Sequence, residues 1–580
     1  MTTGAAQRAT SIAIGVAVAG IASKLFATAA VPAVEGAQWL WLFADDVALA
    51  AGLGLALRGM PAVVARSVGA VAIAWLALGV VFVHALGTPL LATMLCGLHP
   101  AMQDSAGPYL SVAALGPMLV VLGLGGLAAG CSRGWSAPRG PALLVLAVAI
   151  LGCVLAPAPG HRAHRNACFA FARSLLPRAL PVVEVLEITA PNTTEPAPLA
   201  ACAGCARGRS VVVVVLESAA ARFVDGRHPG GQPMPFLAEL AAGGLACRNA
   251  YAVYPESIEG QVPLFCGLPP IPDGEVTVYA AHAKHALPRR LAAHGYASGL
   301  FHAGRFRFLG MEEVLAPFGF DVRADAGTIG GDAESSFGID EESTVDALLR
   351  WVGGLERDQR FVACYLPIAG HHPYSSPPGG PFPRDTQLGC YANALHYADR
   401  SLRRLWEGLQ RLRPAEDLLL CVVGDHGQAF GEHPGNFGHS FELYEENLRV
   451  PLCFHAPGSA LAGLSTQAIC SHLDVVPTLL DLLGLPDTAP AALRGSSLLR
   501  RPTTGGSTCA FTDWGELLVA ARQGRWKLIH EVASGRDRLF DLDADPGELT
   551  NLATGFPEQA GRLRAAALVF AQTARRGVSR

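Results

Sequence analysis

Long apolar runs dominate the first 160 residues, whereas the rest of the chain alternates short apolar runs with amphipathic stretches. Five apolar segments are long enough to cross a bilayer core, which needs about 20 residues. They lie near Thr10–Val34, Gln38–Leu57, Ser67–Leu86, Tyr109–Gly130 and Pro141–Pro157. A signal peptide is the alternative for the first segment. However, this segment lacks a compact basic region at its start, and four further apolar segments follow it. We therefore expect a transmembrane domain of about five helices in residues 1–160.

Basic residues are distributed unevenly between the predicted loops. The N-terminal tail, the second loop and the fourth loop contain Arg8, Arg58, Arg66, Arg133 and Arg139. The first and third loops contain Glu35 and Asp104 and neither Lys nor Arg. Because loops rich in Lys and Arg remain in the cytoplasm, we expect a cytoplasmic N-terminus. Five crossings would then place everything after Gly160 outside the cytoplasmic membrane.

Three ionisable residues fall inside the first two predicted spans. They are Lys24, Asp45 and Asp46. Ionisable groups at that depth usually face the bundle interior and pair with one another. We predict that Lys24 pairs with Asp45 or Asp46, and we favour a structural clamp over a transport role.

From residue 210 the pattern changes to that of an α/β domain. A linker rich in Pro, Ala and Arg spans 161–209, and apolar strand-like runs follow it at Val211–Leu216, Ala297–Phe301, Phe361–Leu366, Leu418–Val423 and Val450–Phe454. Amphipathic stretches at Thr344–Leu355 and Tyr391–Leu412 lie between these runs. Alternating strands and helices predict a largely parallel central sheet in an extracytoplasmic domain of residues 210–580.

Composition agrees with a membrane protein and excludes several other classes. Of the 580 residues, 51% are hydrophobic and only 16% are charged. Ordinary soluble domains contain about 25% charged residues, so a wholly soluble, disordered or coiled-coil protein is excluded. The net charge of −4 gives no electrostatic reason to expect a nucleic-acid partner.

Polar side chains follow three of the predicted strands. Glu217-Ser218 follows the first, His371-His372-Pro373-Tyr374 follows Phe361–Leu366, and Gly424-Asp425-His426-Gly427 follows Leu418–Val423. Ligands of open α/β sheets bind beyond the carboxyl ends of the strands, so these groups are expected at one edge. Each motif alone is weak evidence; their coincidence at one edge is the informative feature.

Glu217, Asp425 and His426 offer carboxylate oxygens and an imidazole, which suit Zn²⁺ or Mn²⁺, with Mg²⁺ also possible. Ser257 is our candidate for a fourth ligand that is also the nucleophile, since it follows a proline and opens a predicted short helix. A metal on its oxygen would make the hydroxyl nucleophilic at neutral pH. The alternative for Ser257 is a simple helix N-cap.

The outer region resembles the sulfatase-like branch of the alkaline phosphatase superfamily from about Val211 to Leu552. The resemblance rests on eight motifs in the family's order: VVVVVLES, PESIEGQVPLFCGLP, FHAGRFRFLGMEEVLAPFGFD, HHPY, YANALHYADRSL, GDHGQAFGEHPGNFGHSFELYEENLRVPL, HLDVVPTLLDLLGL and RWKLIHEVASGRDRLFDLDADPGELTNLA. It implies an α/β sulfatase-like domain that ends in a small C-terminal subdomain.

Two chemistries diverge within this superfamily at the nucleophile. True sulfatases use a C/S-x-P-x-R motif whose first residue becomes formylglycine, and Ser257-Ile258-Glu259-Gly260-Gln261 has neither that Pro nor that Arg. The pattern is more similar to membrane-bound phosphoglycerol and phosphoethanolamine transferases. In those enzymes an unmodified Thr or Ser attacks a phospholipid head group. Their metal is held by Glu, Thr/Ser, Asp and His, which implies Glu217, Ser257, Asp425 and His426 here.

The resemblance also implies residues that contact the substrate. The family histidine near the leaving group matches His371, although the adjacent His372 is a competing candidate. His439 matches a position that in relatives contacts the transferred group or a second metal. His302 and Arg305 are candidates for phosphate binding, with a solvated surface arginine as the alternative. Lipoteichoic-acid synthases have Trp and Arg where this chain has FHAGRFRFLGM, so phosphoglycerol as the transferred group lacks support.

Together these features predict an integral membrane metalloenzyme that transfers or hydrolyses a phospho-group through phospho-Ser257. A membrane lipid would be the donor, and a glycan, another alcohol or water the acceptor. Hydrolysis of sulfate esters without formylglycine is one alternative. A non-catalytic membrane sensor with a hydrolase-like outer domain is the other.

Overall fold

The computed structural model of the chain describes residues 3–31, 42–95, 112–155, 162–176, 178, 180–181, 197–226, 230–332, 337–486 and 495–576. The chain forms two compact units. The first comprises Met1–Pro177 together with Gly431–Phe437. The second comprises Arg178–Phe430 and Gly438–Arg580.

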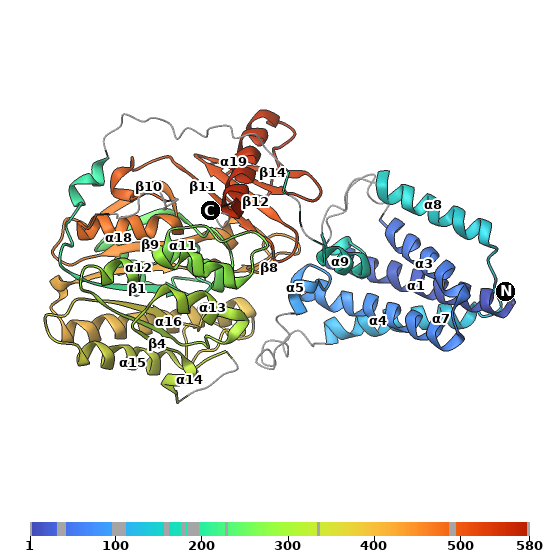
Figure 1. Ribbon diagram of the computed structural model, residues 1–580, viewed down its shortest axis with the longest axis horizontal. Helices are drawn as coiled ribbons and strands as arrows, with labels where there is room; N and C mark the ends of the chain where they lie inside the picture. The colour runs from blue at the N-terminus through green and yellow to red at the C-terminus, as the bar shows by residue number, and fades with distance from the viewer. Residues whose placement is uncertain are drawn as a thin grey trace. The chain divides into compact units, whose positions relative to one another are not determined.

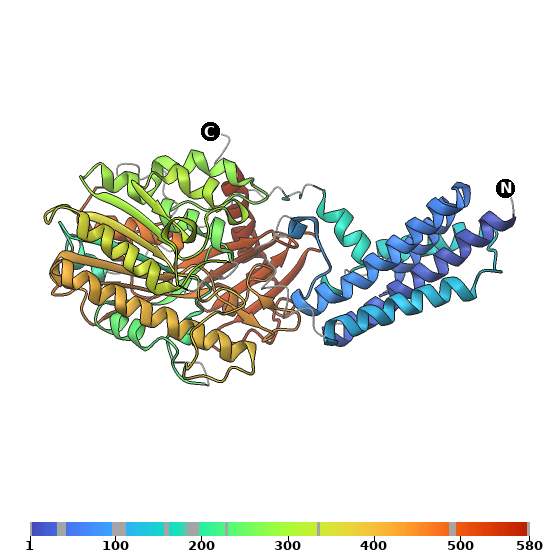
Figure 2. The ribbon, with the colours of Figure 1, turned by 90° about the horizontal axis from the view of Figure 1, so that it is seen from below.

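The first unit is helical. Its α-helices are α1 (Thr3–Ala30), α3 (Ala44–Ala56), α4 (Ala62–Leu86), α5 (Ala92–Leu95), α7 (Val112–Cys131), α8 (Arg139–Leu155) and α9 (Ala167–Ser174). The long helices α1, α4 and α7 run side by side (Figure 2). Small residues allow this packing, because a Cβ added to Gly15 would lie 2.7 Å from the carbonyl oxygen of Gly125. Close approach at small residues is typical of helices that associate in a bilayer.

The five predicted spans are confirmed only in part. In the described residues, α1 and α4 are long and apolar enough to cross a membrane, and the apolar stretches Leu115–Cys131 and Arg139–Leu151 are shorter. Helix α3 has 13 residues, which span about 20 Å, less than a bilayer core of about 30 Å. Parts of the predicted spans near Gln38–Leu57 and Tyr109–Gly130, and the loop residues Glu35 and Asp104, lie outside the described residues.

The predicted pairing of Lys24 with an aspartate is confirmed. Lys24 Nζ forms an ion pair with Asp45 and lies 2.9 Å from Asp46 Oδ2. Asn166 joins the cluster, because its side-chain amide donates to Asp46 Oδ1 at 2.6 Å and its backbone N–H donates to Asp45 Oδ2 at 3.0 Å. The cluster thereby links α1 and α3 to the N-cap residue of α9.

The second unit is built on an eight-stranded sheet in the order β10-β2-β9-β6-β1-β5-β3-β4. Its strands are β1 (Ser210–Leu216), β2 (Leu245–Tyr251), β3 (Ala297–His302), β4 (Val322–Ala324), β5 (Phe361–Leu366), β6 (Leu418–Gly424), β9 (Arg449–His455) and β10 (Leu464–Ser471). The prediction of a largely parallel sheet is confirmed; β9 is the exception, since it pairs antiparallel with β2 and β6.

Helices cover both faces of this sheet (Figure 1). Their bounds are α10 (Pro235–Ala242), α11 (Ser257–Cys266), α12 (Leu287–Ala292), α13 (Met311–Leu315), α14 (Ala326–Ile329), α15 (Glu341–Gly354), α16 (Gln387–Leu412), α17 (Glu445–Leu448) and α18 (Val475–Leu483). One core contains side chains of α11, α12, α13 and α18, and the other contains side chains of α10, α15 and α16. Every residue of β1 is buried, as a strand covered on both faces requires.

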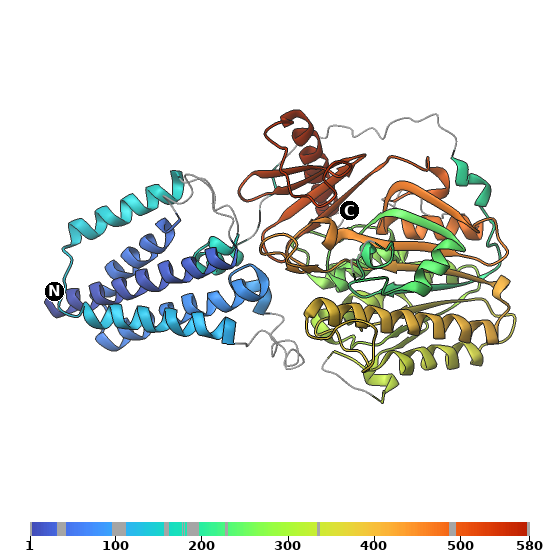
Figure 3. The same cartoon turned by 180° about the vertical axis from the view of Figure 1, so that it is seen from behind.

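A small C-terminal subdomain completes the second unit, as the resemblance implied. Four antiparallel strands form it: β11 (Ser507–Thr512), β12 (Leu518–Gln523), β13 (Trp526–Glu531) and β14 (Arg536–Asp541). Helix α19 (Pro557–Arg576) packs on this sheet (Figure 3). A separate two-stranded ribbon, β7 (Ala429–Phe430) with β8 (Phe437–Gly438), precedes the predicted site residue His439.

Candidate active site

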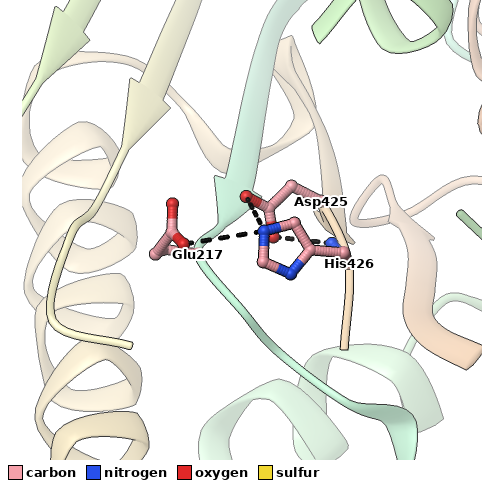
Figure 4. Close-up of side chains that lie close together, drawn as sticks. All are labelled: Glu217, Asp425 and His426. Carbon is pink, nitrogen blue, oxygen red and sulfur yellow. Dashed lines mark hydrogen bonds and ion pairs between the residues drawn. The ribbon is translucent and has the colours of Figure 1, made fainter. Parts of the chain in front are cut away.

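The central strands β1 and β6 bring three predicted metal ligands to one edge of the sheet. Leu216 pairs with Gly424 at the carboxyl ends of these parallel strands. The next residues along the chain are therefore neighbours: Glu217 after β1, and Asp425 and His426 after β6 (Figure 4). All three are buried, and one ligand atom from each lies within 4.8 Å of the others.

Ser257 lies at the same place, as the first residue of α11. Its hydroxyl donates to Glu217 Oε2 at 2.9 Å, and its oxygen lies 3.1 Å from His426 Nε2. Ser257 is not the N-cap of the helix. That role belongs to Glu256, whose side chain accepts from the backbone N–H groups of Ile258 and Glu259. The Ser257 hydroxyl is therefore not occupied by capping.

The spacing of these four groups fits one small divalent cation. Two ligands of a tetrahedral Zn²⁺ bound at about 2.1 Å lie about 3.4 Å apart. Ser257 Oγ lies 3.1 Å from His426 Nε2, and His426 Nε2 lies 3.5 Å from Asp425 Oδ2 and 3.8 Å from Glu217 Oε1. Two carboxylates, an imidazole and a hydroxyl form a donor set suited to Zn²⁺ or Mn²⁺.

The electrostatics of the site also favour a cation. Burial raises the pKa of Glu217 to about 6, and burial raises the pKa of Asp425 to about 7. Backbone N–H groups of Ser218 and His426 donate to Asp425 Oδ1 at 2.8 and 2.6 Å, and Ser218 Oγ donates to Glu217. Because buried carboxylates are stabilised by a compensating positive charge, a bound metal would complete this arrangement.

Hydrogen bonds from Nδ1 orient the rings of His426 and His439, which stack on each other. His426 Nδ1 donates to the carbonyl of Gly427 at 2.9 Å, which leaves Nε2 with the lone pair that a metal requires. His439 stacks on His426 with ring centroids 4.0 Å apart. Its Nδ1 lies 3.1 Å from Gln428 Oε1, and Gln428 Nε2 donates to the Tyr374 hydroxyl at 2.8 Å. In this arrangement His439 Nδ1 donates to the Gln428 oxygen. Burial lowers the pKa of His439 well below its usual value, so the ring is neutral and its Nε2 carries no proton.

His371 follows the next strand of the sheet, β5, and His302 is the last residue of the strand after it, β3. The His371 ring centroid lies 6.4 Å from that of His439, and His371 Nδ1 donates to the carbonyl of His372 at 2.6 Å. His302 is buried, and its Nδ1 donates to the carbonyl of Leu366 at 3.1 Å. Burial lowers the pKa of His302 to about 4, so this imidazole is neutral at pH 7.

Arg305 lies farther along the turn after β3. It is half-buried, and its guanidinium lies beside Gly327 in α14. The structure therefore assembles Glu217, Ser257, Asp425, His426 and His439 at one point, with His371 next to them. It places Arg305 beside α14.

Two residues that hold the site in place were not predicted from the sequence. Ser218 has a left-handed backbone (φ 54°), a conformation uncommon for residues other than glycine. The Tyr391 hydroxyl from α16 donates to the backbone carbonyl oxygen of Ser218. Gln428 fixes the tautomer of His439. Both follow a predicted ligand within two residues, and that proximity is the signal that could have identified them.

A family model matches the part of the chain that contains the candidate site. Residues 209–485 match a family model described as Sulfatase. This segment contains the candidate metal ligands Glu217, Ser257, Asp425 and His426, together with His302, Arg305, His371 and His439.

Among curated proteins, the chain is similar to sulfatases and to lipoteichoic acid synthases. It is 37% identical over 181 residues to choline-sulfatase of Rhizobium meliloti (strain 1021), which covers 29% of this chain and 33% of that protein. It is 29% identical over 244 residues to arylsulfatase K of Mus musculus, with 37% of this chain and 43% of that protein covered. It is 24% identical over 319 residues to lipoteichoic acid synthase 2 of Bacillus subtilis (strain 168), with 51% and 48% covered. The chain thus spans a third to a half of the length of these relatives.

Among solved structures, two similar folds have a TM-score of 0.52 and 19% sequence identity. One is the lipoteichoic acid synthase LtaP from Listeria monocytogenes, with 65% of this chain and 94% of that chain covered. The other is a protein of the alkaline phosphatase superfamily from Vibrio parahaemolyticus, with 64% and 88% covered. Residues 209–485 of this chain therefore match the Sulfatase model, and the fold of the second unit is similar to that of these two solved structures.

Proposed function

We propose that the chain is a membrane-anchored, metal-dependent enzyme that transfers or hydrolyses a phospho-group through an ester on Ser257. The observation that best supports this is the position of the Ser257 hydroxyl, 2.9 Å from Glu217 Oε2 and 3.1 Å from His426 Nε2. It opens a helix at the point where two buried carboxylates and an imidazole meet. The similarity to lipoteichoic acid synthases supports a phosphodiester of a lipid head group as the donor.

A divalent metal held by Glu217, Ser257, Asp425 and His426 would stabilise the Ser257 oxyanion and the charge on the phosphoryl oxygens. The Ser257 oxygen attacks phosphorus in line with the leaving alcohol, and its proton passes to Glu217, which accepts its hydrogen bond. The bond from phosphorus to the alcohol oxygen breaks, and the group is left as phospho-Ser257.

His371 serves both steps as a proton carrier. In the first step it protonates the departing alcohol, and in the second it accepts the proton of the incoming alcohol or water. The second attack breaks the Ser257 Oγ–P bond, and the proton held on Glu217 returns to Ser257 Oγ, which regenerates the serine and the Glu217 carboxylate. His439 and His302 present imidazole groups to the transferred group, and we propose Arg305 as a further anion contact at the rim.

The N-terminal helices provide a reason for a lipid donor. We propose that residues 1–160 form a bundle of five spans, with a cytoplasmic N-terminus and the domain of residues 210–580 on the outer side. Arg8, Arg58, Arg66, Arg133 and Arg139 support this orientation. Attachment to the membrane raises the effective concentration of a lipid substrate at the site.

Mass spectrometry of the intact protein tests the nucleophile. The full-length protein is incubated with vesicles of phosphatidylglycerol or phosphatidylethanolamine, and the peptide that contains Ser257 is examined for a phospho-adduct. We expect an adduct whose mass identifies the transferred group, and we expect Ser257→Ala to lose it.

Ser218→Ala is the matched control for this experiment. Ser218 also donates to Glu217, at 2.9 Å, but it follows β1 and does not begin a helix. Its variant keeps the Ser257 hydroxyl, so the adduct that it forms should map to Ser257. An adduct that survives in Ser257→Ala, or that maps to Ser218, would contradict the proposed nucleophile.

Hydrolysis of a sulfate ester is the second candidate, because the curated relatives include choline-sulfatase at 37% identity. The segment Ser257-Ile258-Glu259-Gly260-Gln261 has neither the Pro nor the Arg of the formylglycine motif. Turnover of 4-nitrophenyl sulfate that is lost in Ser257→Ala would support this candidate over phospho-transfer.

A further inference from the structure

Glu341 is a buried carboxylate outside the candidate metal site. It is the first residue of α15, which is capped by Asp340, and it is 1% exposed. Its backbone N–H donates to the Tyr397 hydroxyl of α16 at 3.0 Å. Burial raises the pKa of Glu341 to about 7, while the hydrogen bonds that it accepts act in the opposite direction.

The Glu341 carboxylate binds the turn between β5 and His371. Its Oε1 accepts from the backbone N–H groups of Ile368 and Ala369, both at 2.8 Å. Its Oε2 accepts from the Tyr365 hydroxyl in β5. Two consecutive N–H groups aimed at one oxygen fix the direction of the peptide chain at the start of the turn.

This turn connects His371 to the candidate metal site. The backbone N–H of His371 donates to the carbonyl of Ile368 at 2.9 Å. Ile368, which Glu341 binds, is therefore hydrogen-bonded directly to the histidine. Gly370 lies against the end of β1, where an added Cβ would be 2.0 Å from the carbonyl oxygen of Glu217. A shift of the turn would therefore move His371 relative to Glu217.

We propose that Glu341 is a positioning residue that acts through His371: its carboxylate holds the 367–371 turn so that the imidazole meets the leaving group. This inference rests on the proposed function, in which His371 protonates the departing alcohol. A displacement of about 1 Å from a productive geometry can lower a rate by about 100-fold.

Asp399 of α16 provides a matched control from the same chain. It is 2% exposed, and it accepts from two consecutive backbone N–H groups, those of Phe236 and Leu237, at 2.9 and 2.8 Å. Its anchored segment is the start of α10, which contains none of the candidate site residues. A purely structural anchor should therefore behave alike at both positions.

The experiment compares four variants of the full-length protein. Glu341→Gln keeps an oxygen for the two N–H groups, whereas Glu341→Asp withdraws the carboxylate by one methylene and Glu341→Ala removes it. Asp399→Ala is the control. For each, kcat and KM are measured on methyl 4-nitrophenyl phosphate and on methyl phenyl phosphate, along with thermal stability and bound metal.

We expect Glu341→Asp and Glu341→Ala to lower kcat by about 10- to 100-fold with KM and bound metal retained. The loss should be greater for the phenyl ester, because its poorer leaving group depends more on a proton donor. Glu341→Gln should restore most of kcat, and Asp399→Ala should lower thermal stability with little change in kcat.

A second measurement does not depend on turnover. Modification of His371 by diethyl pyrocarbonate is followed by peptide mass spectrometry, with the half-buried His294 after α12 as an internal reference. We expect the labelling rate of His371 relative to His294 to change several-fold in Glu341→Ala and to stay the same in Asp399→Ala.

Equal effects of Glu341→Ala and Asp399→Ala on kcat, together with unchanged labelling of His371, would overturn the inference and leave the proposed function intact. A wild-type protein that turns over neither ester counts against the proposed function. In that case the labelling of His371 alone decides whether Glu341 positions it.

Discussion

The two carboxylate oxygens of Asp425 have different roles: one accepts backbone hydrogen bonds, and the other faces the candidate metal site. Oδ1 accepts from the N–H groups of Ser218 and His426, whereas Oδ2 lies 3.5 Å from His426 Nε2. Asp425→Asn keeps an oxygen for the N–H groups and loses the charge that faces the cation. We expect the variant to bind metal at least about 10- to 100-fold more weakly. Metal analysis of the purified protein after dialysis measures this.

The control for this prediction is Asp399→Asn, a change at another buried carboxylate that accepts from two backbone N–H groups. It should leave bound metal unchanged. If the wild-type protein bound no metal, or Asp425→Asn retained it fully, the non-catalytic sensor would become the better interpretation of the outer domain.

At the scale of single residues, the sequence predicted the groups that follow strands and missed those that support them. Glu217, Asp425 and His426 could be found because apolar strand runs end immediately before them. Glu341 could not, because it precedes the turn that it binds by 27 and 28 residues and only the tertiary fold brings the two together. Buried hydrogen bonds of this kind leave no periodic signal in the sequence.

Among the elements, the short helix α11 determines where the candidate nucleophile lies. Its N-cap is Glu256, which is buried and accepts from Ile258 N–H at 2.9 Å and Glu259 N–H at 3.0 Å. Loss of a capping side chain destabilises a protein by about 0.5–2 kcal/mol. We expect Glu256→Ala to lower the free energy of unfolding by that amount, measured by thermal denaturation. We also expect it to lower kcat, because Ser257 is the next residue.

Thr386→Ala separates these two effects. Thr386 caps α16 by accepting from Gly389 N–H at 3.1 Å, and it is exposed. This variant should show a similar loss of stability with an unchanged kcat. If Glu256→Ala lowered stability alone, the start of α11 would have no role in placing Ser257.

The predicted strands were those with uninterrupted apolar runs, and β5 was predicted with its observed bounds. Strands β2 and β10 were not predicted. β2 contains Arg248 and Asn249, and β10 contains the polar run Ser465-Thr466-Gln467. β10 is an edge strand of the sheet, where one side of the ladder has no partner strand and polar residues are tolerated. A search for uninterrupted apolar runs therefore misses strands that contain polar residues, such as β2 and β10.

At the scale of the whole molecule, the composition changes near residue 160, where the apolar helical region ends and the predicted linker of residues 161–209 begins. The two compact units divide at Pro177 and Arg178. The number of spans was harder to predict, because hydropathy does not show where a helix begins. Asp45 and Asp46 lie in the first turn of α3, so this helix is shorter than the apolar segment that contains it.

The cluster of Lys24, Asp45 and Asp46 gives a test of whether the two units are stable independently. Lys24 and Asp46 are 3% and 1% exposed. Removal of one partner from a buried ion pair destabilises by about 3–5 kcal/mol, because a buried charge is left uncompensated. We therefore expect Lys24→Met to lower the thermal stability of the helical unit, measured in detergent by the rate at which Cys168 of α9 reacts with a maleimide dye during heating.

The triple variant Lys24→Met, Asp45→Asn, Asp46→Asn removes all three charges and should recover much of that stability. Turnover of a water-soluble phosphodiester by Lys24→Met should equal that of the wild type, because the candidate active site lies wholly in the second unit. Stability of Lys24→Met equal to the wild type would show that the cluster is not a structural clamp. A parallel loss of turnover would instead show that the outer domain depends on the helical unit for its fold.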